Sequence, residues 1–366
     1  MKILLVTTDI DRSELHLFKR MHEAGLEVHA ICNPEAPYYQ ELAKTGIHLI
    51  PLRIRHRIQP GAIAAIRKLL DTCGIDVVHA LRKSALSNAI IAAYKTPVKI
   101  VTYRGAIGGL SFLDFRSWLS FLSPRVDKII CVAEGVRRYL LSLGLLGLKV
   151  PEGKLVTIPK GHDIAWYAHH DDIDLSAFGI PQGVPIIGCV AAMRPRKGVD
   201  VLIKAMDLLP DRLGNAHLVL VGQVKDRKIV RARENGKSRD RIHLTGNLPH
   251  KQCLALVAKM NLFVLPAIKP EGLPRAVIEA MAQGVPAVVT DVPGSADLVQ
   301  DFVDGRTVEP NDPRALAEAI THMLDDREQL QAYGMRARRK IEEHFNIRAT
   351  VDRTMAVYRE LLERAA

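Results

Sequence analysis

The chain has 366 residues, of which 48% are hydrophobic and 25% charged, and its formal net charge is +11. This length and composition predict two globular domains and exclude a disordered or fibrous protein. The positive charge favours anionic partners. Because only 5% of the residues are aromatic and no recognition helix or base-stacking motif occurs, we expect no nucleic acid among these partners.

The first residues, MKILLVTTDIDRSELH, lack the pattern of a secretory signal, because the apolar stretch is short and acidic residues follow it. No run of about 18 apolar residues occurs, so the sequence predicts no membrane-spanning helix. The five cysteines are scattered singly and form no C-x-x-C pair, which suits a reducing compartment. We therefore expect a cytoplasmic protein that contacts the inner face of the cytoplasmic membrane at most peripherally.

Short runs rich in Val and Ile alternate with amphipathic segments along the chain. Such runs, apolar on both faces, are typical of parallel strands covered by helices. The expected strands are KILLVTT (2–8), EVHAIC (27–32), VVHAL (77–81), KIVTYR (99–104), KIICVA (128–133), LVTIP (155–159), PIIGCVA (185–191), HLVLVG (217–222), LFVLPA (262–267) and PAVVTD (286–291). The alternation occurs twice, so we predict an α/β fold with two doubly wound, Rossmann-like domains that face each other across a cleft.

A polar stretch with several Gly and Pro residues, 168–185, marks the expected domain boundary. We assign residues 1–168 to an N-terminal domain and residues 169–345 to a C-terminal domain. Residues 346–366 are expected to form a helix that packs back toward the N-terminal domain. The DDID stretch at 171–174 has Asp-x-Asp spacing but falls in the expected linker, so we interpret it as a solvated turn and predict no metal site.

Three residues of the first domain leave alternatives open. Asp9 and Asp11 follow the first strand and either orient a bound acceptor or, in the case of Asp11 together with Ser13, cap the next helix. Arg104 ends the strand at 99–104 and either forms a structural ion pair or, as the family resemblance described below implies, contacts an acceptor phosphate or a donor in the cleft. It cannot serve as a general base, because an arginine side chain stays protonated.

Two further segments of the first domain combine arginines with apolar residues. The segment 108–125 concentrates large apolar side chains near Arg116 and Arg125, and it forms either a core helix or a surface that docks on a membrane. The stretch LRIRHRI at 52–58 carries arginines at alternate positions. It is either a solvated face or a face that meets lipid phosphates or a phosphorylated acceptor.

A loop rich in basic residues is the first candidate binding site of the second domain. Arg194, Arg196 and Lys197 crowd the turn between the strand at 185–191 and the next helix. Such clustering is either a solvated turn or a site for a compensating anion, and a diphosphate has the matching charge.

The stretch PEGLPRAVIEAMAQG, residues 270–284, places two glutamates around the start of a helix. Pro274 is expected as the first helical residue and Gly284 as the left-handed end. Free N–H groups before and within the first turn favour an anion, whereas the carboxylates of Glu271 and Glu279 suit the hydroxyl groups of a sugar or ribose. Alternatively Glu279 faces solvent and Glu271 only complements the helix dipole. The small, apolar neighbours of Glu279 favour a buried, partnered carboxylate.

These stretches resemble the retaining, nucleotide-sugar-dependent glycosyltransferases of family 4, also called glycosyl transferases group 1, which have the GT-B fold. EGLPRAVIEAMAQGVP is similar to their E-x7-E signature and RPRKGVDVLIKA to their phosphate-binding loop. TGNLPHKQCLALVAKMNLFVLP and DVPGSADLVQDFVDGRTVEPNDPRALAEAI match the neighbouring segments. The resemblance is strong over residues 185–345 and weaker over residues 1–165.

The resemblance implies roles for individual residues. Glu279 would bind ribose hydroxyls, Glu271 would hold donor-sugar hydroxyls, and Lys197 would neutralise the leaving diphosphate. Many members carry an arginine where this chain has Ala192, so Arg194 or Arg196 must supply the second positive charge. The remaining donor-site residues that the resemblance implies are Gly222, Asn247, Gly272, Leu273 and Pro274.

The function implied is the retaining transfer of a sugar from a nucleoside diphosphate sugar, in first place a UDP-sugar, to an acceptor hydroxyl. The acceptor would be a saccharide or a lipid-linked saccharide of bacterial cell-envelope polysaccharide or lipopolysaccharide synthesis. No metal or other cofactor is expected, because cationic side chains already compensate the diphosphate. The alternatives are a GT-B nucleotide-sugar epimerase and a non-catalytic nucleotide-sugar binder.

Overall fold

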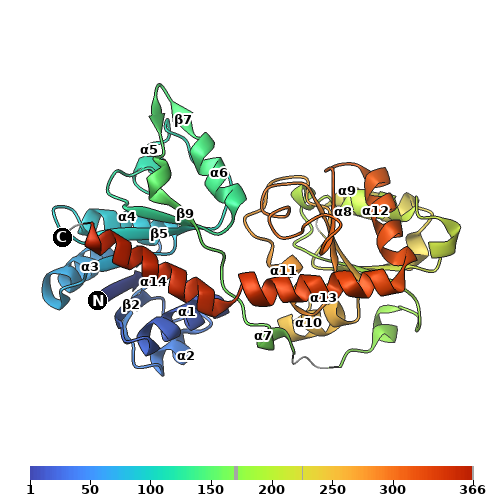
Figure 1. The fold of residues 1–366 in the computed structure, drawn as a ribbon, viewed down its shortest axis with the longest axis horizontal. Coiled ribbons are helices and arrows are strands. Elements are labelled where there is room, and N and C mark those ends of the chain that lie inside the picture. Colours follow the sequence, from blue (N-terminus) through green and yellow to red (C-terminus); the bar gives the residue numbers. More distant parts are fainter. Residues whose placement is uncertain (169–171, 225, 365–366) are drawn as a thin grey trace. The chain divides into compact units, whose positions relative to one another are not determined.

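The structure is a computed structural model that describes residues 1–168, 172–224 and 226–364. The chain divides into two compact units (Figure 1). Unit 1 comprises Met1–Gly161 and Phe345–Ala366, and unit 2 comprises His162–His344. Residues 169–171 follow the expected domain boundary and include the first aspartate of DDID, and they lie outside the described residues.

Within the described residues, unit 1 has a seven-stranded parallel sheet in the order β3-β2-β1-β4-β5-β6-β9. The order reverses between β1 and β4, and Ile3 of β1 pairs with Val28 on one side and Val77 on the other. A small antiparallel hairpin, β7 and β8, lies outside this sheet. The strands are β1 Lys2–Val6, β2 Glu27–Cys32, β3 His48–Pro51, β4 Val77–Ala80, β5 Lys99–Arg104, β6 Lys128–Cys131, β7 Gly144–Leu145, β8 Leu148–Lys149 and β9 Leu155–Thr157.

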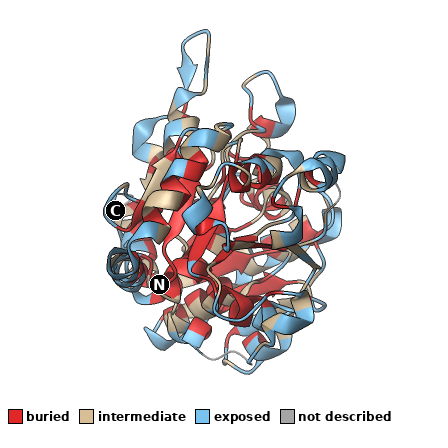
Figure 2. Cartoon of the chain, turned by 90° about the vertical axis from the view of Figure 1, so that its right-hand side faces the viewer, coloured by how far each residue is buried: buried red, intermediate tan, exposed pale blue. Residues whose placement is uncertain are grey.

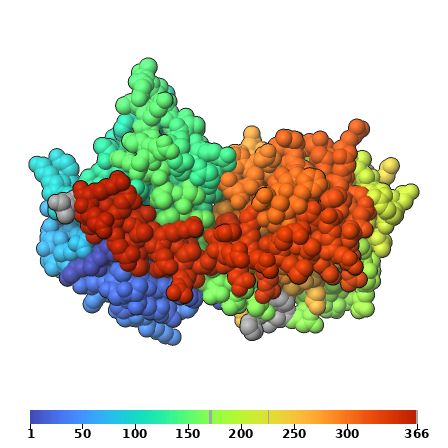
Figure 3. Space-filling model, in the orientation of Figure 1, coloured from blue at the N-terminus to red at the C-terminus, as the bar shows by residue number. Residues whose placement is uncertain are grey.

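The helices of unit 1 come from both ends of the chain. They are α1 Arg12–Glu23, α2 Tyr39–Ala43, α3 Pro60–Cys73, α4 Lys83–Ala92, α5 Phe115–Trp118, α6 Glu134–Ser142 and α14 Ile347–Glu363. Helix α14 lies beside α1, so that the C-terminal segment covers part of the surface made by the first residues (Figures 1 and 3). Leu15 of α1 and Val351 of α14 belong to one buried apolar cluster. A hydrogen bond of 2.6 Å joins Nδ1 of His79 in β4 to the hydroxyl group of Tyr358 in α14.

Unit 2 repeats the same plan, with a six-stranded parallel sheet among its described residues in the order β12-β11-β10-β13-β14-β15. The strands are β10 Ile186–Val190, β11 His217–Val221, β12 Ile242–Gly246, β13 Leu262–Leu265, β14 Ala287–Thr290 and β15 Gly305–Val308. The helices are α7 Ala165–Ala168, α8 Val199–Met206, α9 Arg227–Asn235, α10 His250–Ala258, α11 Arg275–Ala282, α12 Pro313–Asp325 and α13 Arg327–His344. In both units most strands are buried and the outer faces of the helices are exposed (Figure 2).

This architecture confirms the predicted α/β class with two doubly wound, Rossmann-like domains. Each predicted strand forms, with ends that differ by up to a few residues. Among the described residues, no helix is long and apolar enough to cross a membrane.

The buried histidine of β4 makes the stability of the chain sensitive to acid. Burial lowers the pKa of His79 from 6.5 to about 3. Below pH 6.5 the unfolded chain therefore takes up a proton that the folded chain does not. The contribution of neutral His79 to stability is complete above pH 6.5 and is lost as the pH falls toward 3, with a slope that approaches about 1.4 kcal/mol per pH unit. Urea denaturation at several pH values between about 7.5 and 5 measures this slope.

Replacing the histidine identifies the group. We expect His79→Gln to flatten the slope, whereas His56→Gln, which changes an exposed histidine of the same unit, leaves it as in the wild type. Equal slopes in both variants and in the wild type would show that another group causes the acid sensitivity.

Candidate active site

The basic loop of unit 2 is fixed against the end of a neighbouring strand. It follows β10 and forms a single 3-10 turn, Pro195–Lys197, before α8. The backbone of Gly198 lies so close to the carbonyl oxygen of Pro266, just beyond β13, that a side chain would not fit there. The N–H group of Ile268 also donates to the carbonyl oxygen of Arg196 at 2.9 Å. The loop and the segment after β13 therefore form one rigid frame.

This frame brings two cations onto one carboxylate. Glu271 is 8% exposed. Its Oε1 atom lies 3.0 Å from Nζ of Lys197 and 3.2 Å from Nη2 of Arg196. The same Nη2 atom donates to the carbonyl oxygen of Pro270 at 2.8 Å. Two of the three predicted basic residues thus meet the first predicted glutamate.

A second loop holds Glu271 from the other side. The N–H group of Glu271 donates to the carbonyl oxygen of Pro293 at 2.9 Å. Next to Pro293, Gly294 has a φ of +88°, and a Cβ atom there would overlap the carbonyl oxygens of Glu271 and Gly272. Only glycine satisfies both the left-handed backbone and the close approach.

Helix α11 presents the second glutamate toward α10. Glu279 is 5% exposed, and its Oε1 atom lies 2.9 Å from Nε2 of His250, the first residue of α10. The alternative of a solvent-facing Glu279 is therefore wrong. His250 was not predicted from the sequence, although the Leu-Pro-His sequence at the start of a helix was the available signal.

The start of α11 differs by one residue from the prediction. Pro274 is the N-cap, not the first helical residue, because its ψ of 106° is extended, and the helix begins at Arg275. The cap forms no side-chain hydrogen bond. Gly272 and Leu273, both half-buried, lead directly into this uncapped N-terminus, which favours an anion through its free N–H groups.

Two further predicted residues lie where β11 and β12 end, at the same edge of the parallel sheet as the basic loop. The N–H group of Gly222 donates to the carbonyl oxygen of Gly246 at 2.8 Å. Oδ1 of Asn247 accepts a hydrogen bond of 3.0 Å from the N–H group of Gln223. Ligands of open parallel sheets bind at this carboxyl edge.

Arg194 takes a different direction from its two neighbours. Its side chain is exposed and lines an open hollow with Met193, Pro195, Asp226 and Arg227. Arg196, rather than Arg194, is the arginine that the structure places on Glu271.

In unit 1, Asp11 is the N-cap of α1. Its carboxylate accepts from the N–H group of Glu14 at 3.0 Å, and Glu14 in turn accepts from the N–H group of Asp11. Asp11 also pairs with Lys160. Ser13 is not a cap, because its hydroxyl group donates to the carbonyl oxygen of Gly161 at 2.6 Å. Asp9 is exposed, and its Oδ1 atom accepts from the N–H group of Ile10 at 2.9 Å.

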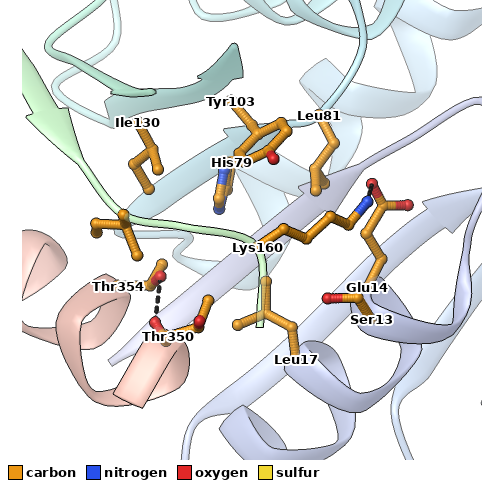
Figure 4. A pocket seen from close by; sticks show the side chains of 11 residues that line it. Ser13, Glu14, Leu17, His79, Leu81, Tyr103, Ile130, Lys160, Thr350 and Thr354 are labelled. Carbon is orange, nitrogen blue, oxygen red and sulfur yellow. Dashed lines mark hydrogen bonds and ion pairs between the residues drawn. The ribbon is translucent and has the colours of Figure 1, made fainter. Parts of the chain in front are cut away.

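A small pocket lies between α1, α14 and the sheet of unit 1 (Figure 4). Lys160 reaches across it, with Nζ 3.1 Å from Oε1 of the buried Glu14, and Arg82 donates to the same carboxylate oxygen at 2.7 Å. The pocket is lined by Ser13, Glu14, Leu17, His79, Leu81, Tyr103, Ile130, Ile158, Lys160, Thr350 and Thr354. Because its charges are paired within unit 1, we regard this pocket as the support of α1 and α14 and not as a binding site.

Arg104 ends β5 as a buried cation. It is 3% exposed, and burial lowers its pKa. Nη2 donates to the carbonyl oxygen of Gly108, and the guanidinium group lies 4.7 Å from the centre of the Phe121 ring. The alternative of a structural ion pair is wrong, because no carboxylate of the described residues forms a salt bridge with it.

Comparison with known proteins agrees with these two domains. The family model described as "Glycosyltransferase Family 4" matches residues 11–166, and the model "Glycosyl transferases group 1" matches residues 171–340. Among solved structures, a glycosyltransferase from Rickettsia africae has a TM-score of 0.82 at 20% identity, with 99% of this chain and 98% of that chain covered. Anabaena Alr3699/HepE in complex with UDP has a TM-score of 0.77 at 18% identity, with coverage of 98% and 100%. The fold is therefore that of the GT-B glycosyltransferases.

Curated relatives point to the same class. A "Phosphatidyl-myo-inositol mannosyltransferase" of Mycolicibacterium smegmatis is 22% identical over 90% of this chain and 84% of its own. A "UDP-Gal:alpha-D-GlcNAc-diphosphoundecaprenol alpha-1,3-galactosyltransferase" of Escherichia coli is 22% identical, with 99% and 96% covered. A "Lipopolysaccharide core biosynthesis mannosyltransferase LpsB" of Rhizobium meliloti is 27% identical, with 67% and 69% covered. The chain belongs to the group 1 glycosyltransferases of family 4, as the sequence predicts. Some of its relatives act in the synthesis of cell-envelope glycans.

The close contact of the Pro293–Gly294 loop with the backbone of Glu271, here called the clamp, can be tested by adding one methyl group. Gly294→Ala forces a Cβ atom against the carbonyl oxygens of Glu271 and Gly272. We expect it to lower the melting temperature more than Gly183→Ala, a matched control in unit 2. Gly183 has a φ of +77° but no atom within 4 Å of its Cβ position, so this change costs only the backbone strain of about 1–2 kcal/mol. Equal melting temperatures for the two variants would contradict the clamp.

Proposed function

We propose that the chain is a retaining glycosyltransferase that takes a sugar from a nucleoside diphosphate sugar, in first place a UDP-sugar. The acceptor is a hydroxyl group of a saccharide or lipid-linked saccharide in cell-envelope polysaccharide or lipopolysaccharide synthesis. The observation that carries the proposal is the meeting of Lys197 and Arg196 on Glu271, just before the uncapped N-terminus of α11. This combination fits a diphosphate next to sugar hydroxyl groups.

In the proposed reaction the bond between the sugar and the diphosphate breaks, and a bond from the sugar to the acceptor oxygen forms. The hydroxyl proton leaves with the diphosphate. Lys197 and Arg196 compensate the charge that grows on the leaving group, and the N-terminus of α11 adds its dipole. Because these groups supply the positive charge, we propose that the reaction needs no divalent cation.

In this proposal Glu279 binds the nucleoside part of the donor. Glu279 accepts hydrogen bonds from the ribose hydroxyl groups, and His250 orients its carboxylate through Oε1. The loops at Gly222 and Asn247 lie beside the base or ribose. In unit 1, Asp9, Asp11 and Arg104 are the proposed acceptor-side residues. Asp11 also caps α1, and Arg104 is buried, so both act mainly by shaping the loops around them.

Binding of nucleoside diphosphates tests the donor site. We expect UDP to raise the melting temperature of the wild type, because a ligand at about 100 times its dissociation constant adds about 2.7 kcal/mol of stability. Lys197→Ala and Glu279→Ala should lose this shift, whereas the surface control Lys204→Ala should keep it. Lys197→Ala should also slow sugar transfer by about 100- to 1,000-fold, the effect of removing one preorganised hydrogen-bond donor from an oxyanion hole.

The same melting-temperature measurements with GDP, ADP, CDP and TDP identify the base of the donor if it is not uracil. No shift with any diphosphate would overturn the donor site. Donor conversion without an acceptor would favour an epimerase, and nucleotide binding without turnover would favour a binder. Activity lost in chelator and restored only by a divalent ion would overturn the metal-free mechanism.

We also propose that unit 1 docks on anionic membranes. The segment 108–125 forms no long helix. It contains the short α5, which begins after its cap Asp114 and ends at Trp118. Phe121 and Leu122 are buried, but Leu113 and Phe115 are 81% and 70% exposed. Nη1 of Arg57 donates to the carbonyl oxygen of Arg116 at 2.8 Å, which joins the basic stretch 52–58 to these apolar side chains. Exposed apolar residues beside arginines suit an anionic lipid surface.

Co-sedimentation with phosphatidylglycerol vesicles tests this surface. We expect Leu113→Ser and Phe115→Ser together to reduce binding by about 100-fold or more, since each buried side chain contributes about 1.5 kcal/mol or more. Leu146→Ser, at the exposed tip of the β7–β8 hairpin, is the control and should bind like the wild type. Equal binding of all three proteins would remove this segment from the docking surface.

A further inference from the structure

Three cations of unit 1 come together at the carboxyl ends of β4 and β5. Arg104 is the last residue of β5, Lys83 is the first residue of α4, and Arg57 lies in the segment before α3. Burial lowers the pKa of Lys83, and the charges of Arg104 and then Arg57 lower it further. The negative charge of Asp114 has the opposite effect and raises the pKa of Lys83. Arg104 and Arg57 therefore each lie within electrostatic reach of Lys83. The contact of Arg104 with Gly108, and of the neighbouring Gly109 with Nζ of Lys83, places these two cations beside the same loop.

Hydrogen bonds fix the elements that carry these cations. Asn88 of α4 donates to the carbonyl oxygen of His56 at 2.9 Å and accepts from the N–H group of Gln59 at 2.8 Å. Ser87 of α4 donates to the carbonyl oxygen of Leu119 at 2.6 Å. With the bond from Arg57 to Arg116, helix α4, the segment 53–59 and the loop 105–119 form one frame.

The positive charge in this frame is only partly compensated, by the carboxylate of Asp114. The Nε atom of the buried Arg104 has no hydrogen-bond partner in the described part of the chain. Neither Lys83 nor Arg57 forms a salt bridge with any described residue. The carboxylate of Asp114 caps α5, where it accepts from the N–H group of Arg116 at 3.0 Å, and among the described residues it forms no salt bridge with the three cations. A buried cation without an anion is costly, so the arrangement favours a bound anion.

The N-terminus of α4 adds to this preference. Its N-cap residue, Arg82, forms no side-chain cap, because a guanidinium group has no hydrogen-bond acceptor, and this group donates to Glu14. The first N–H groups of this ten-residue helix are therefore available to an anion. The loop passes close to Lys83 at Gly109, whose Cβ position would lie 3.9 Å from the Nζ atom. The backbone at this glycine therefore lies next to the ammonium group.

We propose that Arg57, Lys83 and the N-terminus of α4, backed by Arg104, form an anion subsite that binds a phosphate or diphosphate group of the acceptor. This inference rests on the proposed function and narrows it. The acceptor is then a phosphate-bearing saccharide, not a neutral glycan. Three cations and a helix N-terminus match the charge of a diphosphate, and Arg57 can bind its oxygens in a bidentate manner. The docking residues Leu113 and Phe115 belong to the same frame, which suits a lipid-linked diphosphate.

The experiment measures acceptor-side binding with the donor site filled. Titration calorimetry in saturating UDP uses geranyl diphosphate, inorganic pyrophosphate and geraniol as probes. We expect geranyl diphosphate to bind and geraniol not to bind. Lys83→Gln and Arg57→Gln should each weaken the binding by about 10- to 100-fold, as the loss of one charged hydrogen bond does. Lys68→Gln, an exposed lysine of the same unit, is the matched control and should bind like the wild type.

The two diphosphate probes distinguish a lipid-linked acceptor from a soluble sugar phosphate. Tighter binding of geranyl diphosphate than of pyrophosphate supports a lipid-linked acceptor, and equal binding supports a soluble sugar phosphate. The UDP-induced rise in melting temperature, measured in the same variants, reports the donor site independently. If that rise persists while no diphosphate probe binds, or while both variants bind like Lys68→Gln, the anion subsite is wrong and the proposed function stands. If UDP itself gives no rise, the proposed function fails first.

Discussion

The carboxylate of Glu271 is the centre on which the candidate donor site depends. One of its oxygens holds Lys197 and Arg196, which would otherwise repel each other within a single 3-10 turn. The backbone of the same residue is fixed to the loop at Pro293 and Gly294. In the proposed reaction the two cations exchange this carboxylate for the diphosphate, and Glu271 becomes available to the sugar hydroxyl groups. The site is thus preorganised by an internal anion, which reduces the reorganisation required when the donor binds.

Both units position their polar residues by the same principle. Parallel strands end at one edge of each sheet, so the residues that follow them gather there whatever their distance along the chain. In unit 2 this edge collects the loops after β10, β11, β12 and β13. In unit 1 it collects Arg104, which ends β5, and Lys83, which lies just after β4. The two candidate anion sites therefore follow from one architecture used twice.

The sequence predicted the buried, central strands well, since their continuous apolar runs are unlike those of any surface segment. It missed β3, β12 and β15, which lie at sheet edges, because edge strands are short and carry polar residues such as His48, His243 and Arg306. Both glutamates stood out as polar residues among apolar neighbours. The sequence could not decide between Arg194 and Arg196, because the direction of their turn depends on the contact of Gly198 with Pro266, far away in the chain. His250 was missed for the same reason: its partner lies on another helix.

The position of α14 has a consequence for how the polypeptide matures during translation. Unit 1 is discontinuous, since its first 161 residues emerge from the ribosome before all of unit 2, and the helix that covers α1 and reaches His79 emerges after it. Until then the apolar residues of α1 that face α14 have no cover. Unit 2, which is continuous in the chain, can therefore complete its fold first. The nascent N-terminal half must stay soluble with part of its core unfinished, and a chain released early would lose the integrity of its first domain although the missing residues come from its other end.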